Sequence, residues 1–305
     1  MELRHLQHLV ALSEEGSFTR AAQRVHIVQS GLSASIKELE QELGARLVER
    51  TTRKIAFTET GRQFVDHARA TLAALDAGIQ AVRSQDGVVR GRLRLGILQS
   101  LGPYLDLPLL LKRFRTAYPK VEIAVRALSF DAIPALVRSG DFDLSFLPIL
   151  ARTHWPGLQV IPYAQDSLVA ICSRTHPLGT AKSVLLSTLA KEMFVDLSPE
   201  RALRRLVDQA FAEHHLKRNT VFEVNDVQNA LQFVVSGLGV AVVPSALARS
   251  FANSQELLAL KIRADNPKIP NWRIAILRRP RQKTFPGKNT VDLFLEVLAG
   301  MPSVA

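Results

Sequence analysis

The feature that most constrains the fold is a run of three short amphipathic segments within the first 44 residues. The first segment places leucines on one helix face, at Leu3, Leu6, Leu9 and Leu12. Gly16 ends this helix, and Ser17 is a candidate N-cap for a second helix, FTRAAQRV. A third segment follows a tight turn and stops at Gly44. Its apolar positions are Leu32, Ile36, Leu39 and Leu43. Two short helices joined by a tight turn indicate a helix-turn-helix.

The third segment begins unusually, because Val28 occupies the cap position and Gly31 lies in the first turn. A poor cap leaves backbone N–H groups free at a cost of about 1 kcal/mol, and DNA phosphates can accept from such groups. The exposed side of its leading end carries small, polar or basic residues: Gln29, Ser30, Ser33, Ala34 and Lys37. This pattern predicts a helix whose N-terminus enters a major groove. An ordinary solvated amphipathic helix is the alternative.

A short basic β-ribbon is predicted directly after this helix. The β-prone segments RLVER and KIAFT flank the turn at 51–53. Positive charge gathers here, at Arg46, Arg50, Arg53 and Lys54. Such a wing suits contacts with phosphates or with an adjacent minor groove, and a solvated basic hairpin is the alternative.

Residues 59–83 form one long predicted helix with a narrow apolar stripe. The stripe has the spacing of a coiled coil over about three heptads. It consists of Phe64, Ala68, Leu72, Leu75, Ile79 and Val82. Because a long helix with a narrow stripe packs well on a copy of itself, we predict a dimer with an interface running from Phe64 to Ile79. Packing on the body of the same chain is the alternative.

Beyond a break at residues 84–92, strands and helices alternate. The strands RLRLGIL, KVEIAVRAL and FDLSFLP are separated by two helical segments. A second set has the strands DSLVAICSR, TVFEV and GVAVVP, and NWRIAILRR and a final helix close the chain. This order predicts an α/β domain of two sister lobes, each with a mainly parallel, doubly wound sheet.

Charge alone does not locate a nucleic-acid site. The net charge of the 305 residues is +11, but residues 1–90 contribute +1 and residues 91–305 contribute +10. DNA binding by the N-terminal part therefore requires locally segregated charge.

The sequence offers no enzymatic or membrane signature. It contains no HExxH, no GxSxG, no phosphate loop and no complete dinucleotide fingerprint, so neither a metal nor a cofactor is expected. The N-terminus lacks the pattern of a signal peptide and no long apolar run is present, which predicts a soluble cytoplasmic protein. The single cysteine, Cys172, excludes an internal disulfide and lies in an apolar strand.

The whole chain resembles the LysR-type transcriptional regulators. The resemblance rests on the block from LRHLQHLVALSEEG through ARLVERTTRKIAFTETG, and on RGRLRLGI, GDFDLSF and VVSGLGVAVVP. It implies a winged helix-turn-helix at 1–58, a dimerising linker helix and hinge at 59–90, and a periplasmic-binding-protein-like effector domain at 91–305. Lobe 1 would comprise residues 91–163 and 267–305, and lobe 2 residues 164–266.

The resemblance also implies DNA-contacting positions. Gln29, Ser30 and Ser33 match the leading positions of the family's recognition helix, and Arg50 and Arg53 match its wing. The family usually has Ser or Thr at the position of Val28, a departure that bears on base preference. The full set of DNA-binding candidates is Ser17, Thr19, Arg20, Gln29, Ser30, Ser33, Ala34, Lys37, Arg50, Arg53 and Lys54.

An effector site is predicted where strand ends and helix starts of the two lobes face each other. Two opposed helix N-termini and an arginine suit a carboxylate or another small anion. The candidates are Gln99, Ser100, Leu101, Ser129, Phe146, Ser198, Glu200 and Arg201. The alternative is that Arg201, Arg204 and Arg205 only solvate a helix face.

We therefore predict a non-enzymatic, ligand-responsive transcriptional regulator that binds double-stranded DNA as a homodimer or tetramer. Effector binding would change lobe closure and so the spacing of the DNA-binding heads. The expected partners are DNA, a small effector, further copies of the chain and, for an activator, RNA polymerase, with no membrane partner. The rival hypothesis is a small-molecule sensor without a role in gene regulation.

Overall fold

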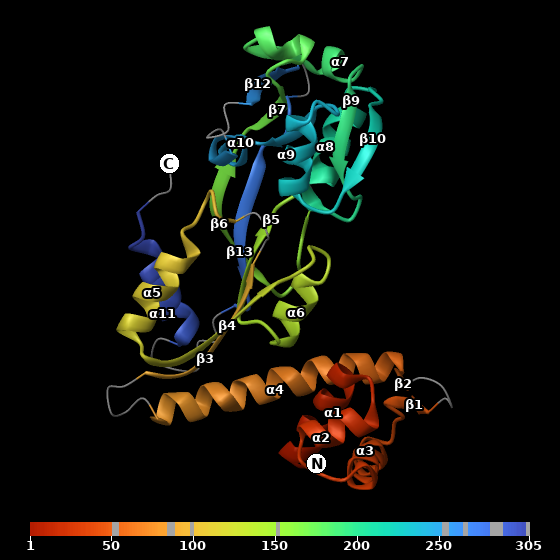
Figure 1. Ribbon diagram of the computed structural model, residues 1–305. Helices are drawn as coiled ribbons and strands as arrows, with labels where there is room; N and C mark the ends of the chain where they lie inside the picture. Colours follow the sequence, from red (N-terminus) through yellow and green to blue (C-terminus); the bar gives the residue numbers. More distant parts are fainter. Residues whose placement is uncertain are drawn as a thin grey trace.

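The computed structural model describes residues 1–50, 55–83, 89–97, 101–150, 153–251, 256–264, 268–280 and 289–302. An N-terminal head is followed by one long helix and by an α/β domain with two lobes (Figure 1). The long helix lies between the head and the α/β domain. None of the helices in these described ranges is both long enough and apolar enough to cross a membrane.

The head is a helix-turn-helix followed by an antiparallel ribbon. Its elements are α1 (Leu3–Glu15), α2 (Phe18–Arg24), α3 (Gln29–Leu43), β1 (Val48–Arg50) and β2 (Ile55–Phe57). The predicted apolar faces form one core, in which Leu9, Leu12 and Leu32 are fully buried. Leu43, which was expected on the inward face, is 37% exposed because it lies at the end of α3, just before Gly44.

Helix α4 (Glu59–Arg83) matches the long helix predicted from the sequence. Its start is fixed to the ribbon, where the Thr58 hydroxyl donates to the Arg46 carbonyl at 2.8 Å and accepts from the Gly61 N–H at 2.9 Å. A Cβ at Gly61 would lie 2.0 Å from the Leu47 carbonyl oxygen. Only glycine therefore allows α4 to approach the backbone of the head this closely.

Lobe 1 is built on a five-stranded sheet with the strand order β4-β3-β5-β13-β6. Its strands are β3 (Arg90–Ile97), β4 (Lys120–Ala127), β5 (Leu144–Pro148), β6 (Gln159–Asp166) and β13 (Trp272–Arg278). Strand β3 runs parallel to β4 and β5, whereas β13 runs antiparallel to β5 and β6. Helices α5 (Leu107–Ala117) and α11 (Thr290–Ala299) pack together, and α6 (Ile133–Ser139) packs on β5 and β13. Both faces of β13 are buried, since Ile274 and Ala275 belong to different apolar clusters.

Lobe 2 contains a four-stranded sheet, β11-β7-β12-β8, and a parallel pair, β9 and β10. Its strands are β7 (Leu168–Ser173), β8 (Ser183–Leu185), β9 (Met193–Leu197), β10 (Asn219–Val224), β11 (Ala241–Pro244) and β12 (Leu257–Arg263). Its helices are η2 (Pro177–Thr180), α7 (Leu186–Leu189), α8 (Ala202–Glu213), α9 (Val227–Val235) and α10 (Ser245–Phe251).

The mainly parallel sheet predicted for lobe 2 is wrong in one respect. Strand β7, predicted to begin the parallel set, runs antiparallel to both β11 and β12. Parallel pairing occurs instead between β8 and β12 and between β9 and β10, and Phe194 of β9 forms a parallel bridge to Val240. Strand β9 was missed because it is short and contains the charged Asp196, which the fold buries with a partner. Strands β6, β8 and β12 were also not predicted from the sequence.

The chain crosses between the lobes at Ser167 and again between β12 and β13, so the boundary predicted at 163/164 falls inside β6. At the first crossing Asp166 accepts hydrogen bonds from Tyr104 Oη at 2.9 Å, Ser245 Oγ at 2.6 Å and Ala246 N–H at 2.7 Å. Burial alone would raise the pKa of Asp166, but these hydrogen bonds, first that from Ala246, lower it. Asp166 thus joins a lobe 1 loop to the start of α10 in lobe 2.

Candidate functional site

One side of α3 is open to solvent over the predicted recognition positions. We call this surface the leading face of α3; it comprises Val28, Gln29, Ser30, Ser33, Ala34 and Lys37. All of these residues are exposed except Ser33, which is half-buried, while Leu32, Ile36 and Leu39 on the opposite side are fully buried. The helix begins at Gln29 without a side-chain cap, and no acidic residue lies in its first turn. Its first N–H groups are therefore available to an outside acceptor.

Residues of α2 position one side chain of this face. The Thr19 hydroxyl donates to Gln29 Oε1 at 3.0 Å, which leaves the Gln29 amide NH2 as the group available for an outside acceptor. Ser17 instead caps α2, because its Oγ accepts from the Arg20 N–H at 3.4 Å. The Arg20 side chain pairs with Glu15 at 3.7 Å. Among the α2 candidates, Thr19 is thus the residue placed directly against α3.

The predicted wing is present as the β1–β2 ribbon, in which Arg50 pairs with Ile55. The Arg50 side chain, Arg53 and Lys54 lie outside the described part of the molecule, so their role stays a prediction. An open groove of about 670 Å³ joins the second half of α3 to β1. Lys37 and Arg46 both line it.

The predicted dimer stripe on α4 divides into two parts. Phe64 packs against the core of the head, and Ala68 is 1% exposed, so Ala68 has no surface to offer to a second chain. The prediction that Ala68 lies in the dimer interface is therefore wrong, because its side chain is buried within its own chain, where α4 packs on α1. Leu72 is half-buried, whereas Leu75 and Ile79 are each 37% exposed. The accessible part of the stripe thus begins near Leu72.

Arg69 on α4 connects the head with lobe 1. Its side chain is only 17% exposed and donates through Nη2 to Ser13 Oγ at 3.0 Å. It also forms ion pairs with Glu14 of α1 at 3.6 Å and with Asp141, just after α6, at 3.4 Å. A displacement of lobe 1 relative to α4 would therefore change contacts made by the head.

Two lobe segments meet at the predicted effector edge. Asp131, in the loop after β4, forms a bidentate ion pair with Arg205 of α8, with N–O distances of 2.7 and 2.6 Å. The guanidinium also lies 5.7 Å from the Phe130 ring centroid. Hydrogen bonding to Arg205 lowers the pKa of Asp131. This inter-lobe ion pair brings the loop that carries Ser129 to the first turns of α8.

Asp131 was not among the predicted effector residues, and Arg205 was named only in the alternative hypothesis, as one of three arginines that solvate a helix face. No local pattern could have paired them, because 74 residues separate them.

The start of α8 has the features of an anion-binding helix terminus. Arg201 is the N-cap residue, no side chain caps the helix, and no acidic residue lies in its first turn. Ser198 is buried, and its hydroxyl donates to Asn225 Oδ1 at 3.1 Å. Glu200 is exposed, and a hydrogen bond from its own backbone N–H lowers its pKa. The backbone N–H groups at the start of α8, together with Arg201 and Arg205, suit the binding of a carboxylate.

Two effector candidates belong to the core instead. Phe146 is fully buried and packs edge-on against Tyr163, with ring centroids 5.2 Å apart. Leu101 is 3% exposed within the same apolar cluster. The prediction that these side chains contact an effector is therefore wrong, since a strand buried on both faces leaves Phe146 no open side. Gln99 and Ser100 lie outside the described residues.

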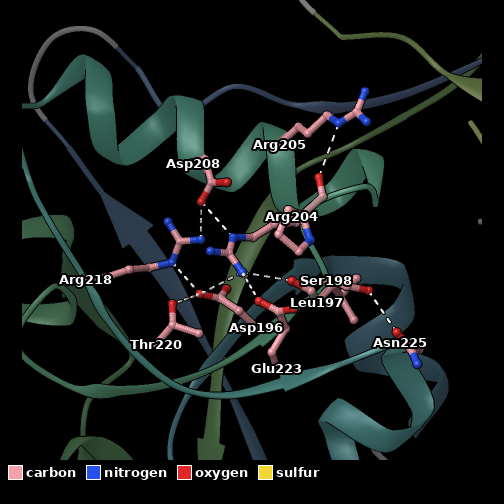
Figure 2. A network of polar contacts seen from close by, with 11 residues as sticks. Asp196, Leu197, Ser198, Arg204, Arg205, Asp208, Arg218, Thr220, Glu223 and Asn225 are labelled. Carbon is pink, nitrogen blue, oxygen red and sulfur yellow. Dashed lines mark hydrogen bonds and ion pairs between the residues drawn. The ribbon is translucent and has the colours of Figure 1, made fainter. Parts of the chain in front are cut away.

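A second charged cluster in lobe 2 is structural (Figure 2). Asp196 and Arg218, 5% and 6% exposed, lie 2.7 Å apart, and Thr220 Oγ1 donates to the same carboxylate at 2.6 Å. Arg204 pairs with Asp208 at 2.8 Å. Figure 2 shows Arg204 directed into this cluster, whereas Arg205 points away from it. The arginines at the start of α8 therefore have different environments.

Across the described ranges, no three histidine, cysteine, aspartate or glutamate side chains gather as metal ligands would. The arrangement as a whole is a DNA-binding type of head joined to a two-lobed domain of binding-protein type.

Two family models match the chain. The bacterial regulatory helix-turn-helix protein of the lysR family matches residues 3–62, and the LysR substrate binding domain matches residues 86–301. The chain belongs to the LysR family of transcriptional regulators. As a LysR-family protein it is a DNA-binding regulator with an effector-binding domain, and the family is not enzymatic.

Individual relatives match over most of their lengths. The uncharacterized HTH-type transcriptional regulator YnfL of Escherichia coli K12 is 34% identical over 82% of this chain and 84% of its own. The hydrogen peroxide-inducible genes activator of Dickeya chrysanthemi is 30% identical over 80% of this chain and 79% of its own. The crystal structure of full-length CbnR with its target DNA is 22% identical, has a TM-score of 0.60 and covers 98% of this chain and 99% of that one, which shows a shared fold.

Proposed function

We propose that this LysR-family regulator contacts its operator as a dimer through the leading face of α3, and that its effector is a small carboxylate or similar anion bound between the lobes. The observation that carries the effector part is the inter-lobe ion pair of Asp131 and Arg205. The DNA part is supported by the exposure of the leading face and by the absence of carboxylates from it.

The inter-lobe ion pair suits exchange with a ligand. Asp131 is 60% exposed and Arg205 is 37% exposed, and an ion pair in such surroundings contributes about 0–1 kcal/mol. A carboxylate ligand can therefore replace Asp131 at Arg205 at little cost while accepting from the free N–H groups at the start of α8. Ligand binding would then change how the lobes close.

A change in lobe position has a route to the head. Asp141 follows α6 of lobe 1 and pairs with Arg69 of α4, which in turn contacts α1. In the dimer, Leu72, Leu75 and Ile79 would hold two copies of α4 together, so the two heads would occupy half-sites a whole number of helical turns apart. Association into tetramers and contact with RNA polymerase belong to the same proposal, as do the domain bounds 1–58, 59–90 and 91–305.

Peroxide is not the signal that we propose, although one relative is named for its response to hydrogen peroxide. An intrachain disulfide needs two cysteines, and this chain has one. Cys172 is fully buried, and burial raises the pKa of its thiol, which lowers the fraction of reactive thiolate. Cys172 therefore has the environment of a structural residue.

The DNA part is tested by a gel shift of the full-length protein on the DNA upstream of its own coding region. We expect a salt-sensitive shift that an excess of random DNA does not abolish. Equal competition by random and upstream DNA would contradict the proposal.

The effector part is tested by thermal shift with small aromatic and aliphatic carboxylates, because a ligand that binds only the native state raises the melting temperature. We expect at least one carboxylate to raise the melting temperature of the wild type, and we expect Arg205→Ala to abolish that rise. Arg115→Ala, an exposed arginine on α5, is the matched control and should keep the rise. A carboxylate that stabilises Arg205→Ala as much as wild type would contradict the proposed site.

A further inference from the structure

The leading face of α3 carries one apolar side chain that the fold does not explain. Val28 is 71% exposed, more than any other large hydrophobic residue in the described part of the chain. As the N-cap residue it works through its backbone alone: its carbonyl accepts from the Leu32 N–H at 3.1 Å, and its side chain makes no cap hydrogen bond. A serine here would cap the helix better. Valine at this position therefore has a cost and no internal contact that requires it.

Gly31, one turn further on, is equally unexplained by packing. It lies in helical backbone, where glycine is less favourable than alanine. A Cβ added at Gly31 would lie 3.6 Å from Val28 Cγ2 and 4.0 Å from Ile27 Cδ1, which are ordinary contact distances. The fold would accept a side chain, so the glycine leaves open space beside a Val28 methyl group. Glycine is typical of places where another molecule approaches the backbone closely.

The space beside Val28 has a chemical counterpart in the major groove. Among the base edges presented there, the C5-methyl of thymine is the apolar group; the other groups are hydrogen-bond donors and acceptors. Gln29, next in sequence, is held by Thr19 with its NH2 available, and this group can donate to an acceptor on a neighbouring base. An apolar contact and a hydrogen-bond donor thus lie side by side at the start of α3.

We propose that Val28 and Gly31 form a contact site for the C5-methyl of one thymine in each operator half-site, adjacent to the base that Gln29 contacts. The inference rests on the proposed function, in which the leading face of α3 enters the major groove. Because the contact is between uncharged groups, it adds sequence preference without adding to the salt dependence of binding. Val28 is on this account a specificity-determining residue.

The test replaces thymines of the bound upstream DNA by deoxyuridine one at a time, which removes the methyl group and leaves base pairing intact. Affinities of the full-length protein are measured by competition. With wild type we expect one thymine per half-site at which deoxyuridine weakens binding about four-fold, the value for one buried methyl group, and about 16-fold when both half-sites are changed.

Two variants separate this contact from folding. Val28→Ser removes both methyl groups and supplies a better cap, and Gly31→Ala fills the space while favouring the helix. Both should fold at least as well as wild type, as measured by thermal unfolding. At the identified thymine, the preference over deoxyuridine should fall to about one-fold in Val28→Ser and should decrease in Gly31→Ala.

Three outcomes decide the matter. A preference for thymine that disappears with Val28→Ser supports the contact. Specific binding of the upstream DNA with no thymine sensitive to its methyl group, or a sensitivity that persists in Val28→Ser, overturns the contact and leaves the proposed function intact. Failure of wild type to prefer its upstream DNA over random DNA overturns the proposed function itself.

Discussion

The head and the effector domain build their candidate sites in different ways. In the head, the six residues of the leading face of α3 lie within a ten-residue segment, from the N-cap Val28 to Lys37, and all of them are exposed except the half-buried Ser33. At the inter-lobe edge, Asp131 and Arg205 come from positions 74 residues apart and meet only when both lobes are in place. Substitutions on the head surface should therefore change recognition and not folding, whereas many charged residues of the effector domain should affect its stability.

The largest expected effect tests the element that joins the two regions. Replacing Leu75 and Ile79 together by aspartate puts charges on the accessible part of the α4 stripe and should separate the dimer. Loss of the second DNA-binding head should lower operator affinity by roughly 10²–10⁴-fold. Sedimentation velocity and gel shift measure both effects, with Ala70→Asp on an exposed side of α4 as the control. A double variant that sediments like wild type would show that α4 packs only within its own chain.

The next effect distinguishes two arginines of lobe 2. Arg218→Ala leaves Asp196 buried without its main partner and should lower the free energy of unfolding of the effector domain by about 3–5 kcal/mol. Arg205→Ala, which breaks the exposed inter-lobe ion pair, should cost less than about 1 kcal/mol. Both tryptophans, Trp155 and Trp272, lie in this domain, so denaturation followed by their fluorescence reports on it. If both variants lost the same free energy of unfolding, the Arg218 ion pair could not be called structural and the Arg205 ion pair exchangeable.

A smaller effect is expected on the head. Gln29→Ala should reduce discrimination between operator and random DNA by about 1–3 kcal/mol and leave the melting temperature unchanged. Lys37→Ala should instead weaken binding to both DNAs alike, since it removes a charge that any phosphate can attract. Parallel titrations of each variant with operator DNA and with random DNA measure the two affinities. If Gln29→Ala lowered both affinities equally, the leading face would act only as a general DNA contact.

The smallest effect concerns the pH dependence of the effector domain. The pKa of Asp166 is lower in the folded state than in the unfolded state. Its ionised form therefore stabilises the fold fully at pH values above the pKa that this carboxyl has in the unfolded chain. That stability is lost as the pH falls through the folded-state pKa. Asp166→Asn should therefore be less stable at neutral pH and should lose less further stability between about pH 5 and pH 3. The exposed Glu122→Gln is the control, and identical acid-unfolding curves for Asp166→Asn and wild type would contradict the account.

The same contrast explains what the sequence could predict. The helices of the head, the ribbon and the bounds of α4 follow from local periodicity and end signals such as Gly16 and Gly44, and the family-level resemblance agrees with them. The sequence does not show which part of α4 contacts the head and which part is free for another chain. The stripe from Phe64 to Ile79 is apolar throughout, yet Ala68 is buried and Ile79 is accessible.

In the effector domain the sequence pattern was less informative. Strand β9 was missed because Asp196 interrupts its apolar pattern, and nothing local shows that Arg218 compensates that charge from 22 residues away. Phe146 was expected at the effector because it lies near a strand end, but burial depends on the neighbouring strands and helices rather than on its own segment. Contacts between distant segments depend on tertiary packing, which a single local pattern does not contain.

The close approach at Gly61 has a mechanical consequence. Because the backbone of α4 touches the backbone of Leu47 there, directly before the ribbon, the head and the first turns of α4 must rotate as one rigid lever. A helix of 25 residues is about 37 Å long. Turning it by about 10° at its far end would carry the head through about 6 Å, close to the rise of two base pairs. A modest rotation of the effector domains could thus shift the heads to a different register along the double helix.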